Sequence, residues 1–442
     1  MTKRYVTKNT TKLYTDSTGS SFSAVLIYGD EVDATGTEQN NRSEVNARSY
    51  TGWIKKDDLQ TNPVLEIYFI DVGQGDSTFI VTPSRKKILV DGGRDNRALH
   101  FLIWKYRLDK DENPAIDIDL LVQSHGDEDH IKGLTSIISH PKFKVKKIIH
   151  SGIAVFKSGQ FDTELGQTMT QNGTKYLRTS HDKITDLNST KLSPNFLAWH
   201  NAIINEANVK YNAVDSTTGL VNIDPEVSIE VLGPRMHALG NNKVYRWFGD
   251  KAHTINGHSV VLRLTYNNIK LLLAGDLNIP GEENLLEDPN LAAKMDAHVL
   301  KAPHHGSHEY VRNWLDAVNP QISVISSGDE PDYGHPRANF IADVGNASRI
   351  KSDSLVFSTE IAATFVQVND NLGNIDLTED EKKGLTQPTR EKIRGLFKRK
   401  LNGMINVRTD GNKLYAARRI SHPTSWWEHY GPFEPAPRSI NL

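Results

Sequence analysis

Two histidines and two aspartates lie within six consecutive residues, in the segment His125-Gly126-Asp127-Glu128-Asp129-His130. The segment follows an apolar run typical of a buried strand and precedes a run with helical periodicity. On a tight loop between two such elements, imidazole nitrogens and carboxylate oxygens can converge on one point, where they are suitable ligands for a divalent metal. A solvated acidic loop is the alternative, and it gives no reason for two histidines directly after a buried strand. We therefore predict a metal site here.

Other potential ligands stand at the ends of further apolar runs. One histidine opens the run at 259–265, one aspartate closes the run at 270–275, and three further histidines stand in Pro-His-His-Gly-Ser and Tyr-Gly-His-Pro segments. Polar side chains at the ends of apolar strands can build a site on the rim of a sheet. Each residue alone could belong to the surface or to a turn, but together they predict one site. The candidates are His258, Asp276, His304, His305 and His335.

The composition excludes several kinds of chemistry. The 442 residues include no cysteine, which excludes disulfides, a thiol nucleophile and cysteine-ligated zinc or iron–sulfur clusters. Any metal must be held by His, Asp, Glu or backbone oxygen, and the 17 His are an ample supply. With 52 Lys+Arg against 54 Asp+Glu, the net charge of −2 excludes a globally basic nucleic-acid coat but leaves room for a local basic groove.

The sequence contains no segment that suits a membrane. No apolar run approaches the ~20 residues needed to cross a bilayer. No apolar stretch follows the basic first residues, as it would in a signal peptide. We therefore expect no membrane segment and a cytoplasmic protein. The oligomeric state is left open.

The first sixty residues indicate a small all-β unit. At 1–62 the sequence resembles bacterial SH3-like modules in the turn Tyr-Gly-Asp-Glu-Val at 28–32 and in the closing Thr-Gly-Trp-Ile at 51–54. An unrelated β-hairpin cap is a nearly equal alternative. An SH3-like unit would suggest a protein partner for this end of the chain.

The rest of the chain alternates strand and helix patterns, which predicts an α/β core followed by a tail. The predicted parts are a core at 63–420, insertions at about 151–226 and 369–402, the second one helical around 388–401, and an extended tail at 421–442. The predicted core strands are 65–70, 78–81, 88–90, 119–123, 147–150, 227–232, 259–265, 270–274, 299–300 and 322–325. Helices are predicted at 97–108, 131–139, 282–286 and 310–318, and a hairpin at 404–418.

The motifs at these strand ends occur in a familiar order. They are Phe-Ile-Asp-Val-Gly-Gln-Gly-Asp-Ser at 69–77, Val-Asp-Gly-Gly at 90–93, Ser-His-Gly-Asp-Glu-Asp-His at 124–130, His-Ser-Val-Val-Leu at 258–262, Ala-Gly-Asp at 274–276, Pro-His-His-Gly-Ser at 303–307 and Tyr-Gly-His-Pro at 333–336. Over about 64–365 the chain resembles the metallo-β-lactamase superfamily, and within it the ComEC-type, competence protein-like hydrolases. The first insertion, the helix at 388–401 and the N-terminal unit fall outside this resemblance.

The resemblance implies an αβ/βα sandwich with a dinuclear metal site between the sheet ends. Residue by residue, it assigns His125, Asp127 and His258 to the first metal, and Asp129, His130 and His335 to the second, with Asp276 bridging both. Asp127 stands where the wider superfamily usually has His. Many ComEC-type chains have no ligand at the position of His258. Because a carboxylate is a harder ligand than an imidazole, the first site suits Mn²⁺ or Mg²⁺ better than an all-His site would. Zinc stays open.

A site with two divalent ions (Zn or Mn) would activate water and clamp phosphate oxygens. The implied catalytic residues are Asp276 and Asp129 at the metals, with His304 or His305 serving the leaving oxygen as general acid or oxyanion partner. Since neighbouring residues on an extended segment point to opposite sides, we expect only one of this pair to face the metals. Asp91 is expected to orient a ligand histidine, and Asp76 either does the same or fixes a turn.

The resemblance to the ComEC-type branch implies a metal-dependent phosphodiesterase, and most specifically a nuclease acting on DNA or RNA. The alternatives are a small-molecule phosphodiesterase or phosphocholine-ester hydrolase, and a non-catalytic regulatory or assembly module. Basic residues between 382 and 419 could follow a phosphate backbone, or they could form an ordinary solvated helix face. Trp426 and Trp427 could stack on bases, or they could pack a tail against the body.

Overall fold

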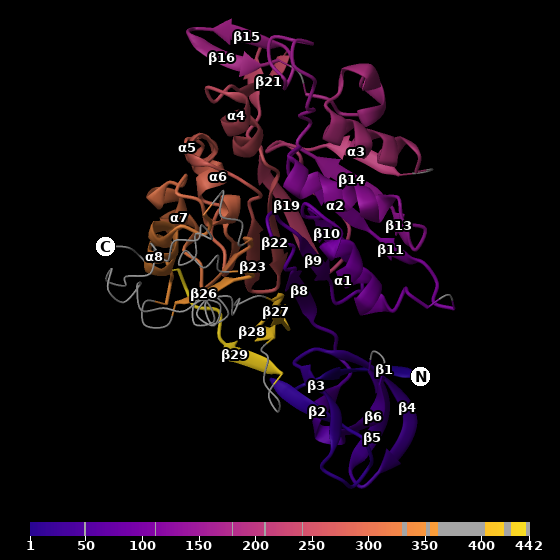
Figure 1. Cartoon of the computed structure of the whole chain (residues 1–442). Coiled ribbons are helices and arrows are strands. Elements are labelled where there is room, and N and C mark those ends of the chain that lie inside the picture. Colours follow the sequence, from indigo (N-terminus) through magenta and orange to yellow (C-terminus); the bar gives the residue numbers. More distant parts are fainter. Residues whose placement is uncertain are drawn as a thin grey trace, which may run out of the picture.

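The core of the molecule is a sandwich of two β-sheets (Figure 1). The computed structural model describes residues 1–438 except 48–49, 111, 179, 207–208, 241, 329–333, 351–353, 361–402 and 420–425. In this part of the chain the strand order is β17-β14-β12-β10-β9-β8-β27-β28-β29 in one sheet and β18-β19-β22-β23-β24-β25-β26 in the other.

The first sheet mixes antiparallel and parallel strands. β8, β9 and β10 form an antiparallel meander, and β12, β14 and β17 continue it in parallel. On the other side of β8, the hairpin β27–β28 and then β29 extend it in antiparallel fashion. The bounds are β8 Leu65–Phe69, β9 Thr78–Val81, β10 Lys87–Val90, β12 Leu120–Gln123, β14 Lys147–His150, β17 Lys210–Ala213, β27 Ile405–Thr409, β28 Leu414–Arg419 and β29 Trp427–Phe433.

The second sheet is antiparallel up to β23 and parallel from β23 to β26. The parallel strands β23 and β25 are mostly apolar because nearly all of their residues are buried. Their bounds and those of their antiparallel neighbours are β18 Gly219–Leu220, β19 Val227–Gly233, β22 Val261–Tyr266, β23 Ile269–Leu273, β24 Val299–Lys301, β25 Ile322–Ile325 and β26 Leu355–Ser358.

Helices cover the outer face of each sheet. α1, α2 and α3 pack on the first sheet through residues such as Leu102, Leu134 and Trp199, whereas α5, α7 and α8 pack on the second through residues such as Trp314 and Phe340. Apolar side chains of both sheets fill the space between them. The predicted αβ/βα architecture is therefore present. The helices are α1 Arg97–Tyr106, α2 Glu128–Ile138, α3 Pro194–Ile204, α4 Lys251–Gly257, α5 Ile279–Leu286, α6 Pro289–Ala292, α7 Arg312–Val318 and α8 Ala338–Asn346.

The N-terminal region is all-β, as predicted, with the strand order β3-β2-β6-β5-β4-β1-β7 and a core of its own around Leu13, Val45 and Ile54. It lies at the lower end of the molecule in Figure 1. Its likeness to SH3 modules stays a prediction. The bounds are β1 Thr2–Val6, β2 Thr10–Tyr14, β3 Phe22–Ile27, β4 Glu31–Gln39, β5 Arg42–Ala47, β6 Tyr50–Lys55, η1 Lys56–Asp58 and β7 Leu59–Gln60.

The segment predicted as an extended tail contributes strand β29, which pairs with β28. Trp427 in this strand is buried beside Val25 and Ile27 of the N-terminal region, and its indole Nε1 donates a hydrogen bond to the Val25 carbonyl at 3.1 Å. The packing role predicted as one alternative for this tryptophan is therefore the observed one. Proline-rich sequence around the strand concealed it.

The first insertion forms a cap over one end of the sandwich (Figure 1). Its hairpin β15–β16 joins β21 and β20 in a small sheet, and Trp199 of α3 donates a hydrogen bond to the Gln123 side chain at 2.8 Å. The remaining elements are β11 Ile116–Ile118, β13 Phe143–Val145, β15 Thr168–Gln171, β16 Thr174–Leu177, η2 Ile184–Asp186, η3 Ser189–Lys191, β20 His237–Leu239 and β21 Asn242–Arg246.

The predicted helical insertion at 369–402 lies outside the described residues. It contains most of the basic residues between 382 and 419 that could follow a phosphate backbone. Of the residues that are described, no helix combines the length and the apolar character needed to span a membrane.

Candidate metal centre

The predicted ligands meet where strands of the two sheets end. Parallel pairing aligns Val90 with Val122, and in the other sheet Leu273 with Lys301, so the segments after these strands emerge at one edge. The sheets are joined at this edge, where the amide of Val260 donates a hydrogen bond to the Ser124 carbonyl at 2.9 Å. Because carboxyl ends of parallel strands share an edge, residues far apart in the sequence become neighbours here.

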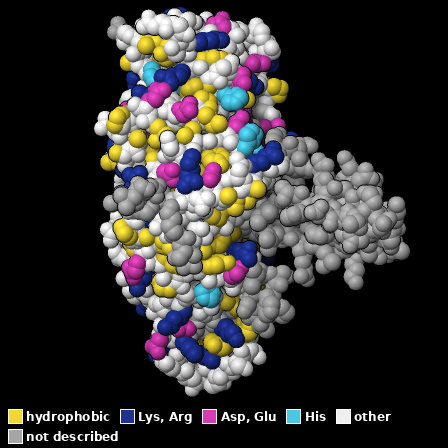
Figure 2. All heavy atoms as spheres, turned by 90° about the vertical axis from the view of Figure 1, so that its left-hand side faces the viewer, with side chains coloured by type: hydrophobic (Ala, Val, Ile, Leu, Met, Phe, Trp, Pro, Cys, Tyr) yellow, Lys and Arg dark blue, Asp and Glu magenta, His cyan; other side chains and the backbone are white. Residues whose placement is uncertain are grey.

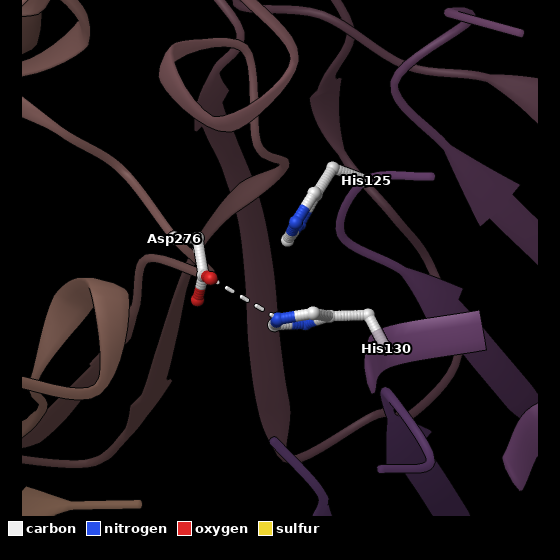
Figure 3. A group of neighbouring side chains, drawn as sticks. All are labelled: His125, His130 and Asp276. Atoms are coloured by element: carbon white, nitrogen blue, oxygen red, sulfur yellow. Dashed lines mark ion pairs between the residues drawn. The ribbon is translucent and has the colours of Figure 1, made fainter. Parts of the chain in front are cut away.

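Asp276 is the point on which the site converges. Its Oδ2 lies 3.2 Å from Nε2 of His130 and 3.0 Å from Nε2 of His305. Figure 3 shows His125, His130 and Asp276 pointing toward one another across the gap between the two sheets. Ligand atoms lie within 4.8 Å of one another in overlapping groups, namely His125, His130 and Asp276; Asp129, His130 and His305; and Asp76, Asp276 and His305.

Asp91 fixes the orientation of His130. Its Oδ2 lies 2.9 Å from His130 Nδ1, and the same carboxylate accepts hydrogen bonds from the hydroxyl and the amide of Ser124 at 2.6 and 2.8 Å. Asp91 has φ 57°, a left-handed conformation that Asp tolerates better than most residues. With Nδ1 held in this way, Nε2 of His130 points to Asp276.

The polar atoms that face the centre fit a bound cation. These atoms are buried, and apart from the ion-pair contacts of His130 and His305 with Asp276 they have no hydrogen-bond partner within the described structure: Nε2 of His125, Nε2 of His130, Nε2 of His305, Oδ1 of Asp276 and Oδ1 of Asp76. Leaving such groups without partners in a folded protein is costly. Nitrogen and carboxylate donors in this combination are typical ligands of divalent transition metals.

The electrostatics of the cluster fit a bound cation. Burial alone would raise the pKa of the Asp276 carboxyl, but His305 and His130 hold it well below its usual range. Burial alone would lower the pKa of His130, but Asp276, Asp91 and Asp129 raise it well above the ordinary value. The carboxylates therefore favour positive charge at the point where the histidine nitrogens meet.

Residues 70–328 match the family model of the Metallo-beta-lactamase superfamily. The chain belongs to this superfamily. Its members are metal-dependent hydrolases, and the convergent nitrogens and carboxylates described above are the candidate metal centre of this one.

Two curated competence proteins are similar to parts of this superfamily member. It is 23% identical over 284 residues to ComE operon protein 3 of Bacillus subtilis strain 168, which covers 61% of this chain and 29% of that protein. It is 39% identical over 82 residues to Competence protein ComA of Neisseria gonorrhoeae, 18% of this chain and 12% of that protein. The chain thus spans less than a third of the length of either relative.

Two solved structures that are similar to this chain have lower sequence identities than the two competence proteins. One is a metal-dependent hydrolase of the β-lactamase superfamily, 12% identical, with a TM-score of 0.34 over 66% of this chain and 94% of that one. Another is CmlA, a diiron β-hydroxylase from Streptomyces venezuelae, 14% identical, with a TM-score of 0.32 over 68% of this chain and 54% of that one. The family assignment rests on the sequence match and not on these structures.

His304 and His305 stand in a tight turn and not in the extended segment that we expected. Their φ angles are 44° and 53°, in the left-handed region, within the 3-10 turn η4 Pro303–Gly306. The turn directs His305 to Asp276 and Asp129, and the Nδ1 of His305 lies 3.0 Å from the Ser326 carbonyl. His304 lies nearer the outside, with its Nδ1 3.5 Å from Glu309 and its ring 5.7 Å from that of His335. His305 therefore joins the ligand cluster.

Asp127 and His335 flank the cluster. Oδ2 of Asp127 lies 3.7 Å from Nε2 of His125, and its side chain is 38% exposed. The ring of His335 stacks on that of His305 with 6.2 Å between the ring centres. Both predicted ligands therefore lie near the centre, Asp127 partly exposed and His335 buried.

The structure does not bring His258 into the groups of converging ligand atoms found among the described residues. Its Nε2 lies 2.7 Å from the Arg246 carbonyl, and its ring packs between Tyr245 and Phe248. The carbonyl comes from β21, which the motif order could not anticipate. Burial lowers the pKa of His258 to about 4, and its Nδ1 has no hydrogen-bond partner within the described structure.

A buried lysine completes the surroundings of the centre. Lys301 ends β24, is 2% exposed, and donates hydrogen bonds to the Asp76 carboxylate and to the Gly275 carbonyl, the latter at 3.2 Å. Asp76 in turn has its Oδ1 3.4 Å from Nδ1 of His305. Sequence reasoning left Asp76 open and overlooked Lys301. The sequence feature that could have identified Lys301 is a lysine at the end of an apolar strand.

Proposed function

We propose that this chain is a metal-dependent phosphodiesterase that cleaves nucleic acid. The convergence of three histidine nitrogens and the Asp276 carboxylate, with buried ligand atoms that lack hydrogen-bond partners, is the observation that carries the proposal. The competence proteins that match parts of the chain support a nucleic-acid substrate over other phosphodiesters. The metal-dependent hydrolase activity of the superfamily supports the reaction class.

The centre has ligands for two divalent ions. The residues placed to hold them are Asp127, Asp129, His125, His130, His305 and Asp276, with Asp276 between the two groups. When bound, such ions supply Lewis acidity toward the phosphate and lower the pKa of water. Zinc and manganese both suit this mixed nitrogen and oxygen set.

The protein's own groups position the centre and serve the substrate. Asp91 holds the His130 ring, and the Ser259 hydroxyl, 3.1 Å from the Asp276 amide, supports the turn that presents Asp276. His304 stands at the mouth beside Glu309. Burial lowers the pKa of His304, so it is a neutral imidazole whose ring N–H donates to the leaving oxygen or to a non-bridging phosphate oxygen.

The proposal is tested with purified protein, metal and a set of substrates. With Mn²⁺, and in parallel with Mg²⁺ and Zn²⁺, we expect cleavage of single-stranded DNA, duplex DNA or RNA, and of a chromogenic phosphodiester. Asp276→Asn should lower the rate of cleavage by at least ~10³-fold while the fold persists. A neutral amide cannot replace the negative charge of a carboxylate that lies between the two groups of ligands.

Asp224→Asn is the matched control, since Asp224 accepts hydrogen bonds from Thr82 and Ser84 on the first sheet and takes no part in the described ligand groups. It should keep the wild-type rate. Cleavage of the chromogenic ester with no cleavage of any nucleic acid would assign the centre to small phosphodiesters. Full activity of the Asp276→Asn variant would remove Asp276 from the centre.

A further inference from the structure

A groove lies between the N-terminal β unit and helix α1, away from the metal centre. It has a cavity volume of about 590 Å³. Aromatic side chains line it from three directions, with Tyr50 from β6, Trp104 from α1 and Trp426 just before β29. Tyr50 and Trp104 are each 46% exposed, which is unusual for side chains of this size.

Cations alternate with these aromatic rings. Arg107, Lys110 and Arg419 line the groove, and Asp109 is the one acidic side chain among the described residues that line it. The guanidinium of Arg419 lies 5.5 Å from the centre of the Trp426 ring. The described face of the molecule over α7 and α8 is different, because there basic and acidic side chains are interspersed (Figure 2). The groove is therefore a local positive and aromatic surface on a chain of almost neutral net charge.

The exposed face of α1 connects this groove to the rim of the metal centre. Arg97, His100 and Trp104 follow one another at spacings of three and four residues, which places them along one side of α1, and Arg107 is the residue directly after the helix. At the first turn, Arg97 lies 3.9 Å from Asp71 and lines a small pocket with Gly73 and Gln74.

That rim adjoins the ligands themselves. A Cβ added to Gly75 would lie 2.2 Å from the backbone oxygen of Asp129, so the loop after β8 rests directly on a ligand residue. The ten residues of α1 span about 15 Å at 1.5 Å per residue. A flexible strand lying along α1 would therefore reach from the groove to the rim.

We propose that the groove binds single-stranded nucleic acid and guides it along α1 to the metal centre. Bases stack on Trp104, Tyr50 and Trp426, since base stacking on aromatic side chains is how single strands are held without sequence preference. Arg107, Lys110 and Arg419 contact the phosphates. That the strand is guided to the metal centre rests on the proposed nuclease function. Binding of the strand in the groove does not depend on catalysis.

Binding is measured apart from cleavage. In the presence of chelator, a fluorescein-labelled single strand of about 20 nucleotides should bind the full chain, with the anisotropy giving Kd. Trp104→Ala and Arg107→Glu should each raise Kd about tenfold. Arg107→Glu should also lower the slope of log Kd against log salt by about 1, as expected for a lost phosphate contact.

Two exposed positions on other elements supply the controls. Leu220→Ala on β18 matches the loss of an apolar side chain in Trp104→Ala, and Lys243→Glu on β21 matches the charge reversal in Arg107→Glu. Both should leave Kd within about twofold of the wild-type value, and all four variants should cleave the chromogenic phosphodiester at the wild-type rate. A wild-type Kd for the Trp104→Ala and Arg107→Glu variants would overturn the groove proposal, even if nucleic acid is cleaved.

The two proposals fail in different ways. Binding that depends on the groove, with no nucleic-acid cleavage under any metal, would leave the groove proposal standing and overturn the proposed nuclease function. Absence of nucleic-acid binding together with binding of a labelled polyglutamate peptide would assign the groove to an acidic protein partner and overturn the proposal made here.

Discussion

The two ends of strand β8 carry buried charge in opposite ways. At its first half, Glu66 pairs with Arg85 and Lys105, each at 3.2 Å, and Arg408 pairs with Asp30 at 2.9 Å. We call these five residues and Tyr68, which accepts a hydrogen bond from Arg408 at 3.1 Å, the junction cluster. Past the other end of β8 lies the metal centre, where buried carboxylates face histidine nitrogens that lack hydrogen-bond partners.

The difference separates a structural charge cluster from a binding site. In the junction cluster, side-chain cations of the chain itself balance Glu66 and Asp30, so nothing further is needed. In the centre, Lys301 pairs with Asp76, whereas the described ion pairs of Asp129 and Asp276 are with histidine nitrogens. A buried charge without a partner is costly, so a cluster with too few cations is expected to take up a cation from solution.

The largest expected effect breaks the junction cluster. Arg408→Met should lower the free energy of unfolding by ~3–5 kcal/mol, because it leaves Asp30 and Glu66 buried with less positive charge. Urea unfolding measures this loss. Arg418→Met on the same hairpin is the control, since its pair with Glu428 is partly exposed and contributes ~1 kcal/mol or less. The metal content of Arg408→Met should equal that of the wild type; a fall would show that the two clusters are coupled.

Adding metal should stabilise the centre and not the junction. Mn²⁺ at 100 to 1,000 times its Kd should raise the free energy of unfolding of the metal-free protein by about 3–4 kcal/mol. Thermal unfolding with and without chelator measures the increment. Arg408→Met should show the same increment, whereas Asp276→Asn should show a much smaller one. An equal increment in the Asp276→Asn variant would place the stabilising ion elsewhere.

The junction cluster should also govern stability in acid. Burial alone would raise the pKa of Glu66, but Lys105, Arg408 and Arg85 lower it to about 2 in the folded protein, from 4.5. A depressed folded pKa stabilises above pH 4.5, and the contribution disappears as the pH falls from 4.5 to about 2. Glu66→Gln should therefore lose up to ~3 kcal/mol relative to the wild type at neutral pH, and this difference should shrink through that window.

Urea unfolding at several pH values between 2 and 7 measures the difference. Glu112→Gln, at an exposed loop position, is the control and should follow the wild-type profile throughout. A Glu66→Gln deficit that stays constant down to pH 2 would mean that the ionised carboxylate is not what stabilises the junction.

The sequence predicted the centre better than the junction cluster for a physical reason. The ligands in 125–130 are close in the sequence, so local spacing predicts that they can converge. Arg408 and Asp30 are separated by almost the whole chain, and only the pairing of β27 with β8 brings them together. The same limit applies to β29, whose pairing and burial of Trp427 depend on the N-terminal unit.

Side-chain direction was the other limit. His258 precedes an apolar strand and His305 follows one, and no local sequence feature distinguishes the two. The left-handed backbone at His305 turns its ring into the centre. The Arg246 carbonyl and the rings of Tyr245 and Phe248 hold the ring of His258 in place in the core. Neither arrangement has a local sequence signature, so membership of the ligand set depended on the fold.

The smallest expected effect on metal binding follows from this contrast. His258→Gln should leave the number of metal ions per chain unchanged, because Nε2 of His258 is engaged by the Arg246 carbonyl at 2.7 Å. His305→Gln is the matched change and should lower the metal content, since Nε2 of His305 faces Asp276 at 3.0 Å. Elemental analysis after dialysis against Mn²⁺ or Zn²⁺ measures both. Loss of an ion from the His258→Gln variant alone would restore the ligand set implied by the family resemblance and remove His305 from it.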